Sequence, residues 1–300
     1  MEWRACIAIG LGIGCGSVSS NHDANTGDGS GSGSDATDAP PPPACDLNKP
    51  FGTPTQVLGI HNANADDKHA TLTADEKTIF FASNRDNTMG IWHIYTATRS
   101  SPTGAFSAVD FAPGTYSAEG ESHPSVSADG NTIFYDSYRV TSGLLHIFWA
   151  TRSNAAVQFP AGTMITGDYL MHPGVTTDGK VVYTASIQSG FINRLDKQGA
   201  GWSAPQIVNL PNTPTAVSPV TNDDLTLYVS LGNTSAGMQV AVSKRASTST
   251  GFSMAMPVAE LDNGAALAEP SWLSPDGCRL YLTYAMGAGK QTIFVATKPQ

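Results

Sequence analysis

Positive charge is scarce in this 300-residue sequence, and charged residues make up only 14% of it. Lys and Arg number 16 against 25 Asp and Glu, which gives a formal net charge of -9. A surface with this balance repels phosphate backbones, so we expect no nucleic-acid partner.

Long hydrophobic runs and several enzyme motifs are also missing. The apolar stretch from Ala5 to Gly14 is too short to span a bilayer, which needs ~20 residues. There is no Gly-x-Ser-x-Gly elbow, and no Gly-rich phosphate loop precedes a helix. The sequence therefore does not support nucleophilic catalysis, and no catalytic residue is assigned.

The first 14 residues have the pattern of a secretory signal peptide. They carry one early cation, Arg4, then the short apolar run and small residues. The stretch "LGIGC" resembles a bacterial lipobox, which implies lipidation of Cys15; ordinary signal cleavage is the alternative. No Asp follows Cys15, so the resemblance implies a protein secreted across the inner membrane and anchored in the outer membrane, facing the periplasm or the cell surface.

Residues 15–45 have almost no apolar side chains and are rich in Gly, Ser, Asp and Pro. Such a segment cannot bury enough surface to offset its ordering entropy, so it predicts a disordered tether. The remaining residues, 46–300, are ample for one large domain.

An internal repeat dominates this domain. It reads "LTADEKTIFFASNR" from Leu72, "VSADGNTIFYDSYR" from Val126, "VTTDGKVVYTASIQ" from Val175, "VTNDDLTLYVSLGN" from Val220 and "LSPDGCRLYLTYAM" from Leu273. The central aspartates are 54, 49, 45 and 53 residues apart: Asp75, Asp129, Asp178, Asp223 and Asp276. Five units with a period near 50 indicate a repeat architecture.

Each unit predicts short β-strands around a hairpin turn. Runs such as "TIFYDS" are β-branched and aromatic, and the preceding Asp-Gly suits a tight turn. Four strands per unit predict an all-β, five-bladed β-propeller. The last unit lacks a fourth strand, and "FGTPTQVLGI" from Phe51 resembles the missing one. We therefore expect the N-terminal strand to complete the fifth blade.

The quoted repeats are similar to the TolB-type repeat, the Pro-Asp-Gly variant of the WD repeat. The resemblance covers residues 51–300 and implies the propeller fold. Asp224 departs from it, because glycine is usual after the turn aspartate. The family includes scaffolds, peptidase lids and a few lyases, so the resemblance does not name an activity.

Histidines recur at one position of the repeat, six residues before the turn aspartate: His69, His123 and His172. When the units are aligned on the following proline, units four and five carry Ser218 and Glu269 there. This position begins the innermost strand, so we expect His69, His123, His172 and Glu269 to converge near the axis.

Two interpretations of this histidine set stay open. The side chains could bond backbone groups at the strand starts, or they could bind a ligand or a divalent metal such as Zn, Mn or Ni. The oligogalacturonate lyases are similar in holding a metal with histidines before such turns. No cofactor is otherwise expected. The turn aspartates lie on separate blades, too far apart for a glycosidase pair, and predict turns only.

Two cysteines remain after the signal and Cys15. Cys278 follows the turn of the fifth unit, and Cys45 precedes the strand that completes that blade. We therefore expect a disulfide between Cys45 and Cys278, which fits an oxidising compartment.

Together these patterns predict an envelope-anchored, monomeric propeller that binds an envelope protein or a glycan without catalysis. The alternative is a metal-dependent polysaccharide lyase or hydrolase that acts at the histidine set.

Overall fold

The computed structural model describes residues 45–86, 89–141, 144–186, 190–212, 216–220, 223–233, 237–285 and 290–300. Side chains of 141, 216–220 and 233 are not described. The predicted signal peptide, Cys15 and the tether up to residue 44 lie outside the described residues. No helix within the described ranges is long and apolar enough to cross a membrane.

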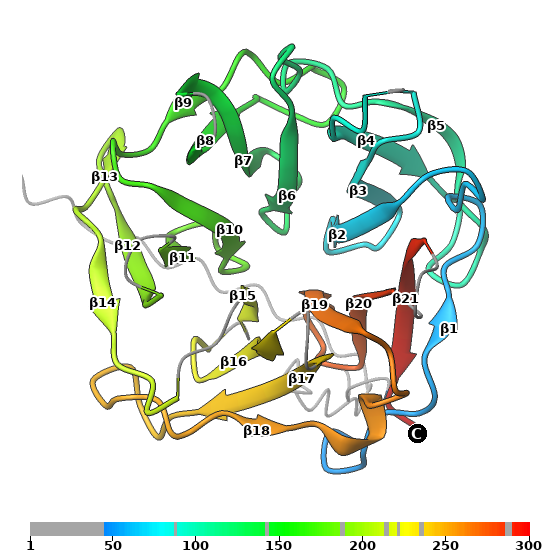
Figure 1. The fold of residues 1–300 in the computed structure, drawn as a ribbon, viewed down its shortest axis with the longest axis vertical. Coiled ribbons are helices and arrows are strands. Elements are labelled where there is room, and N and C mark those ends of the chain that lie inside the picture. The colour runs from blue at the N-terminus through cyan, green and yellow to red at the C-terminus, as the bar shows by residue number, and fades with distance from the viewer. Residues whose placement is uncertain are drawn as a thin grey trace, which may run out of the picture. The chain divides into compact units, whose positions relative to one another are not determined.

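Five antiparallel sheets surround a common axis, and they form the five predicted blades (Figure 1). Blade 1 contains β2 (Asp67–Leu72), β3 (Thr78–Ser83), β4 (His93–Thr98) and β5 (Ser107–Phe111). Blade 2 contains β6 (Glu121–Val126), β7 (Thr132–Thr141), β8 (Leu144–Thr151) and β9 (Thr163–Met164). Blade 4 contains β15 (Ala216–Val220), β16 (Thr226–Asn233), β17 (Gly237–Lys244) and β18 (Met256–Pro257).

Blade 3 departs from four strands. Its inner strands are β10 (Leu170–Val175), β11 (Val181–Ser186) and β12 (Ile192–Gln198). Two short strands, β13 (Gly201–Trp202) and β14 (Gln206–Val208), both pair with β12, so this sheet has five strands. β12 pairs with β14 through its first residues, Ile192–Arg194, and with β13 through its last residues, Lys197 and Gln198.

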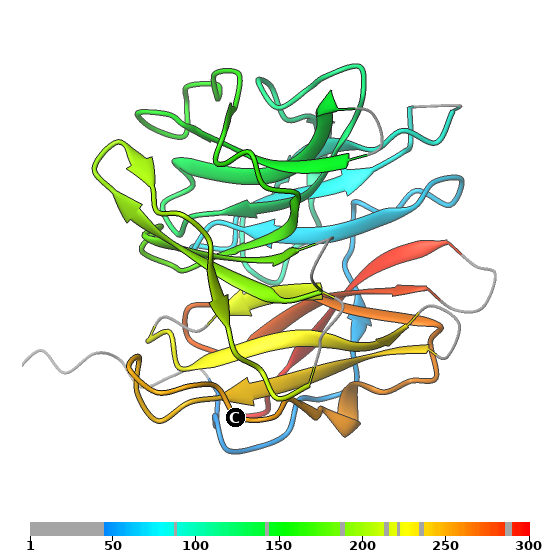
Figure 2. The ribbon, with the colours of Figure 1, turned by 60° about the vertical axis from the view of Figure 1, so that its left-hand side comes forward.

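The N-terminal strand closes the ring, as the sequence predicts. Blade 5 has β19 (Leu267–Leu273), β20 (Arg279–Ala285) and β21 (Gln291–Thr297), and β1 (Thr55–Gln56) supplies its outer edge. Thr55 pairs with Val295 in antiparallel register. In Figures 1 and 2 the blue segment of β1 runs beside the red β21. The edge of the last blade is thus covered by the start of the domain.

A disulfide joins Cys45 and Cys278 beside this closure. Their Cα atoms are 5.7 Å apart. Both side chains are buried, at 6% and 1% exposure. The bond ties the entry of the chain to the first turn of blade 5.

The turn aspartates have the structural role expected for them. Thr73 donates its hydroxyl to Asp75 Oδ1 at 2.6 Å, and the amide of Lys77 donates to the same oxygen at 3.0 Å. The equivalent hydroxyl–carboxylate bonds recur in three other blades: Ser127 to Asp129, Thr176 to Asp178, and Ser274 to Asp276. Each aspartate is used to close its own turn.

Two acidic residues replace glycine after the turn aspartate, and both bridge blades. Glu76 and Asp224 have positive φ angles of 55° and 59°. Glu76 accepts two bonds from Arg279 Nε of blade 5, at 2.7 and 2.8 Å. Asp224 accepts bonds from Tyr183 and Arg194 of blade 3, at 2.8 and 2.5 Å. The departure at Asp224 therefore strengthens a contact between neighbouring blades.

The hydrophobic core lies between sheets. In one cluster Ile79 and Phe81 of blade 1 pack with Trp272 and Tyr281 of blade 5. In another, Phe80 and Ile94 of blade 1 pack with Ile133 of blade 2. Each blade therefore buries its faces against its neighbours, and the inner strands are held in fixed positions around the axis.

Candidate functional site at the propeller axis

The three repeated histidines sit on β-bulges of the innermost strands. The pairing of β2 with β3 shifts between Lys68 and Thr71, and the equivalent shifts in blades 2 and 3 enclose His123 and His172. The three histidines have left-handed backbones, with φ of 54°, 48° and 54°. Such a conformation costs about 1–3 kcal/mol in a residue other than glycine. A bulge turns a side chain away from its ordinary direction, and here it turns three of them toward the axis.

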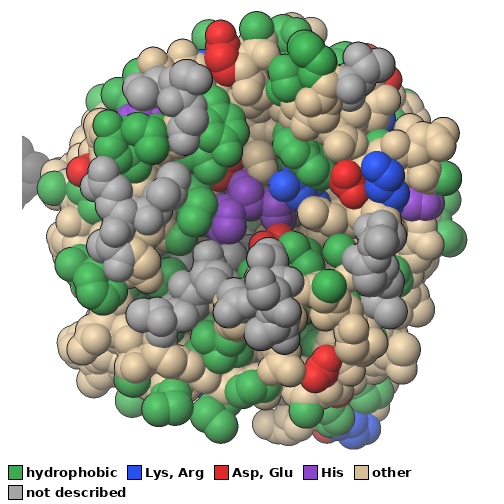
Figure 3. Space-filling view, in the orientation of Figure 1, with side chains coloured by type: hydrophobic (Ala, Val, Ile, Leu, Met, Phe, Trp, Pro, Cys, Tyr) green, Lys and Arg blue, Asp and Glu red, His purple; other side chains and the backbone are tan. Residues whose placement is uncertain are grey.

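The structure brings the three imidazoles into one stack. The ring centroids of His69 and His123 are 3.7 Å apart, and those of His123 and His172 are also 3.7 Å apart. His69 and His172, at the two ends of the stack, are 6.0 Å apart. Figure 3 shows histidine side chains at the bottom of a central depression, with a basic side chain beside them. The expected convergence of His69, His123 and His172 is therefore seen.

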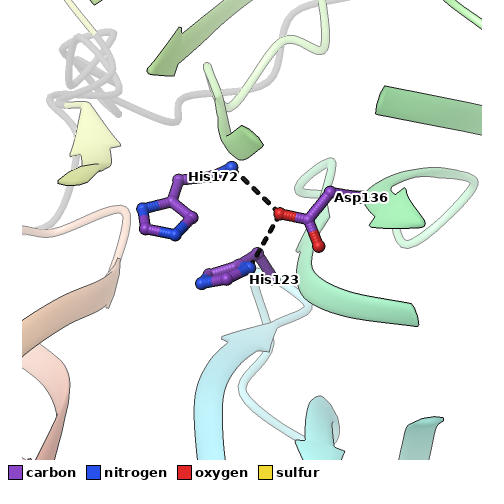
Figure 4. Close-up of side chains that lie close together, drawn as sticks. All are labelled: His123, Asp136 and His172. Carbon is purple, nitrogen blue, oxygen red and sulfur yellow. Dashed lines mark hydrogen bonds and ion pairs between the residues drawn. The ribbon is translucent and has the colours of Figure 1, made fainter. Parts of the chain in front are cut away.

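Two carboxylates contact the histidine set. Nε2 of His69 lies 2.7 Å from Oε2 of Glu269, which comes from the neighbouring blade 5. Nδ1 of His123 lies 2.8 Å from Oδ2 of Asp136. The same Asp136 oxygen accepts the backbone N–H of His172 at 3.2 Å (Figure 4). The four predicted residues thus divide into the pair His69–Glu269 and a second group that includes Asp136.

Strand register corrects the alignment behind Glu269. Glu269 pairs with Thr283, whereas Ser122 pairs with Asp136 at the corresponding place in blade 2. Glu269 therefore corresponds to the residue before the histidine, and aligning on proline shifted it by one. Its side chain still reaches His69 across the blade interface. The side chain of Ser218, the fourth-blade residue in the same alignment, lies outside the described residues.

Sequence reasoning missed Asp136. It occupies a place on the second strand of the blade that is Ala82 in blade 1, Ala185 in blade 3 and Thr283 in blade 5. Its side chain is fully buried. A carboxylate at a position that is otherwise small and uncharged was the available signal, since a buried charge needs a specific partner.

Lys68 was missed as well. It precedes His69, and its ammonium lies 3.8 Å from the centre of the Trp92 ring. Burial lowers the pKa of Lys68, while the charges of Glu269, Asp136 and Asp66 act in the opposite direction. Lys68 thus lies against an aromatic ring and lines the same pocket as His123.

Burial keeps the imidazoles neutral. Desolvation is the largest cause that lowers the pKa of His69 and of His123 well below the usual value. The pKa of His172 falls to about 3, because of burial first and the neighbouring His123 second. Burial also raises the pKa of Asp136. Rings stacked at 3.7 Å cannot be charged together, so the set offers nitrogen lone pairs at neutral pH.

Three buried polar atoms of the site have no hydrogen-bond partner among the described residues: Nδ1 of His69, Nδ1 of His172 and Oδ1 of Asp136. Leaving such an atom unpaired costs about 1–3 kcal/mol.

Ser122 does not turn the group into a catalytic triad. Its hydroxyl lies 2.9 Å from Nδ1 of His123, the same nitrogen that faces Asp136. A relay needs the hydroxyl and the carboxylate on opposite nitrogens.

A pocket of about 300 Å³ opens beside the stack, between blades 1 and 2. His123 and Asp136 lie on its wall together with Lys68, Trp92 and Tyr138. Glu119 and Glu121 add carboxylates, and Glu121 is fixed by Arg139 at 2.9 Å. The pocket therefore combines two aromatic rings with charged groups of both signs.

The neutral imidazoles make stability depend on pH. Because the unfolded chain binds protons below pH ~6.5 and the folded stack does not, stability falls as pH drops from 7 to 5. In metal-free protein, we expect His172→Gln to reduce this loss by about 2 kcal/mol. Urea unfolding at pH 7 and at pH 5 measures the loss of unfolding free energy in each protein. Equal losses in wild type and His172→Gln would contradict the prediction.

The comparisons with known proteins concern the fold. No family model matches the sequence, and no curated protein matches it. An α-L-arabinofuranosidase from Podospora anserina, solved in complex with cellotriose, has a TM-score of 0.55 at 13% identity, over 84% of this chain and 98% of its own. A glycosyl hydrolase from Bacteroides ovatus has a TM-score of 0.55 at 13% identity, over 82% of this chain and 93% of its own.

TolB from Acinetobacter baumannii is also similar, with a TM-score of 0.44 at 17% identity over 84% of this chain and 55% of its own. The two structures with TM-scores of 0.55 show the β-propeller fold alone. At such identities they transfer no activity, because one fold carries many unrelated sites. What the site does must be argued from its own residues.

Proposed function

We propose that this propeller is a binding protein of the bacterial envelope, and that it binds a neutral glycan in the pocket between blades 1 and 2. The observation that carries the proposal is the pairing of aromatic rings with polar groups on that pocket's wall. Ligand sites in proteins are concave, mostly apolar and furnished with a few fixed polar groups.

The lining chemistry favours a sugar. The C–H face of a sugar ring is weakly positive, and it packs on the negative face of an aromatic ring such as Trp92 or Tyr138. Tyr138 is 40% exposed, so a ligand can reach it. Carboxylates accept bonds from sugar hydroxyls, and the ammonium of Lys68 donates to them. Because acidic side chains flank Lys68, a strongly anionic ligand is disfavoured.

Binding to neutral oligosaccharides tests this proposal. A neutral glycan found by array screening should bind with a dissociation constant that rises at least tenfold in Tyr138→Ala, measured by calorimetry. Tyr116→Ala is the matched control, because Tyr116 is an exposed tyrosine, at 60%, that does not line the pocket. If no neutral glycan binds, or if both variants bind as the wild type does, the proposal is wrong.

Metal-dependent cleavage of the glycan is the second candidate. His123 and Asp136 belong both to the pocket wall and to a group able to hold a metal, which favours a reactive centre beside the bound sugar. The same binding experiment separates the two. New reducing or unsaturated ends that appear with metal and stop with EDTA support a hydrolase or a lyase; intact glycan supports binding.

The location in the envelope is part of the proposal. The Cys45–Cys278 disulfide supports export, because such bonds persist in oxidising compartments. The lipobox resemblance at Cys15 and the polar tether support an outer-membrane lipid anchor that holds a monomeric propeller away from the bilayer. An envelope protein that contacts the same face is the alternative partner, and pull-down from envelope extract would find it.

A further inference from the structure

We infer that His123, Asp136 and His172 bind one divalent transition-metal ion at the propeller axis. One ligand atom from each of the three side chains lies within 4.8 Å of the others. Ligands around a tetrahedral zinc ion are ~3.3 Å apart, so side-chain movements of about an ångström complete the set. Figure 4 shows the two rings and the carboxylate facing a common space from β6, β7 and β10.

The carboxylate is placed for a cation. Asp136 is fully buried. The charge of Lys68 acts on it, but among the described residues no Lys or Arg comes close enough to form an ion pair with it. Its Oδ2 faces His123 and the amide of His172, while Oδ1 has no partner in the described part of the chain. A buried carboxylate with a free oxygen is costly unless a charge is supplied. A divalent ion between the two imidazoles would supply it.

The backbone supports the same conclusion. His123 and His172 hold left-handed conformations that only the bulges impose, and neighbouring blades repeat the arrangement. Strain of this kind is retained where a side chain must point in one direction. His69 has the same left-handed backbone and an unpaired Nδ1, so these features mark the whole stack. The nearby carboxylate of Asp136 distinguishes His123 and His172 as the metal ligands.

The ligand set selects the class of metal. Calcium and magnesium take oxygen ligands, whereas two neutral imidazoles with one carboxylate suit zinc, manganese, iron, cobalt or nickel. Three protein ligands leave a coordination position open, and the pocket beside His123 and Asp136 gives a small molecule access to it.

His69 and Glu269 have a positioning role. His69 lies outside the three-residue group, but its ring stacks on His123 at 3.7 Å. Since an ionised carboxylate only accepts, Glu269 fixes the proton of His69 on Nε2. The stack then holds the ring of His123 in the orientation that the metal requires.

Zinc titration of the full mature protein, after treatment with EDTA, tests the inference without any glycan. Calorimetry should give one Zn²⁺ per chain with a dissociation constant at or below the micromolar range, and Co²⁺ should give visible absorption that Zn²⁺ abolishes. A failure of this test leaves glycan binding untouched, and a failure of glycan binding leaves this test untouched.

Matched variants locate the ion. Three variants should each weaken Zn²⁺ binding at least 100-fold: His123→Ala, His172→Gln and Asp136→Asn. In Asp136→Asn, the side-chain amide oxygen can still accept from the backbone N–H of His172. His69→Gln should weaken it by less than tenfold, and the surface control His61→Gln should have no effect. The inference is overturned if the wild type does not bind Zn²⁺, or if the three ligand variants bind it as tightly as the wild type.

Discussion

The double variant Cys45→Ser/Cys278→Ser is expected to lose about 5 kcal/mol of unfolding free energy. The disulfide joins residues 233 positions apart, so it closes almost the whole described domain into one loop. Cross-links that close long loops restrict the unfolded chain most. The folded state also depends on the bond, because β1 pairs with β21 over only two residues.

Urea unfolding of the mature protein, with and without dithiothreitol, measures this effect. Reduced wild type should unfold at the same urea concentration as the double variant, and dithiothreitol should not change the variant. A loss below about 1 kcal/mol would mean that the loop-entropy account does not hold for this ring.

Glu76→Gly is expected to lower the unfolding free energy by about 3 kcal/mol, although glycine suits the backbone better. Glu76 has a φ of 55°, and the equivalent turn residues Gly130, Gly179 and Gly277 have φ near 70°. The substitution therefore relieves backbone strain. It also removes the carboxylate that binds Arg279 of blade 5 and Arg99 of blade 1. Glu76 is 2% exposed, so both guanidinium groups lose a buried partner.

A double-mutant cycle gives the control for this prediction. Arg279→Met in the Glu76→Gly background should recover part of the loss, because removing both partners of a buried pair costs less than removing one. Chemical denaturation of the four proteins measures the coupling. A Glu76→Gly protein as stable as the wild type would show that the blade 1–blade 5 contact does not depend on the ion pair.

The sequence predicted the ring and its closure because those features depend on short stretches. The Asp-centred turns close through bonds between residues two to five apart, such as Thr73 with Asp75 and Thr78. The likeness of the segment from Phe51 to the fourth strands of the other units predicted where the ends of the ring meet. Local pattern was enough here, since each unit repeats one supersecondary structure.

The convergence of His69, His123 and His172 was also predictable, because equivalent positions of successive blades face the same axis. The partners of those histidines were not. Asp136 lies on another strand and reaches His172 of the next blade, and Glu269 reaches His69 from the far end of the chain. The strand register of Glu269 also differs by one residue from its alignment on proline.

By itself, then, the sequence determined the all-β fold, the number of blades, the closing strand and the place where histidines gather. Only the tertiary structure decided that His123 and His172 group with Asp136, and that His69 pairs with Glu269. The reason is physical. The repeated sequence pattern reflects contacts within one blade. Burial, ring stacking and hydrogen bonds between blades depend on how neighbouring blades pack.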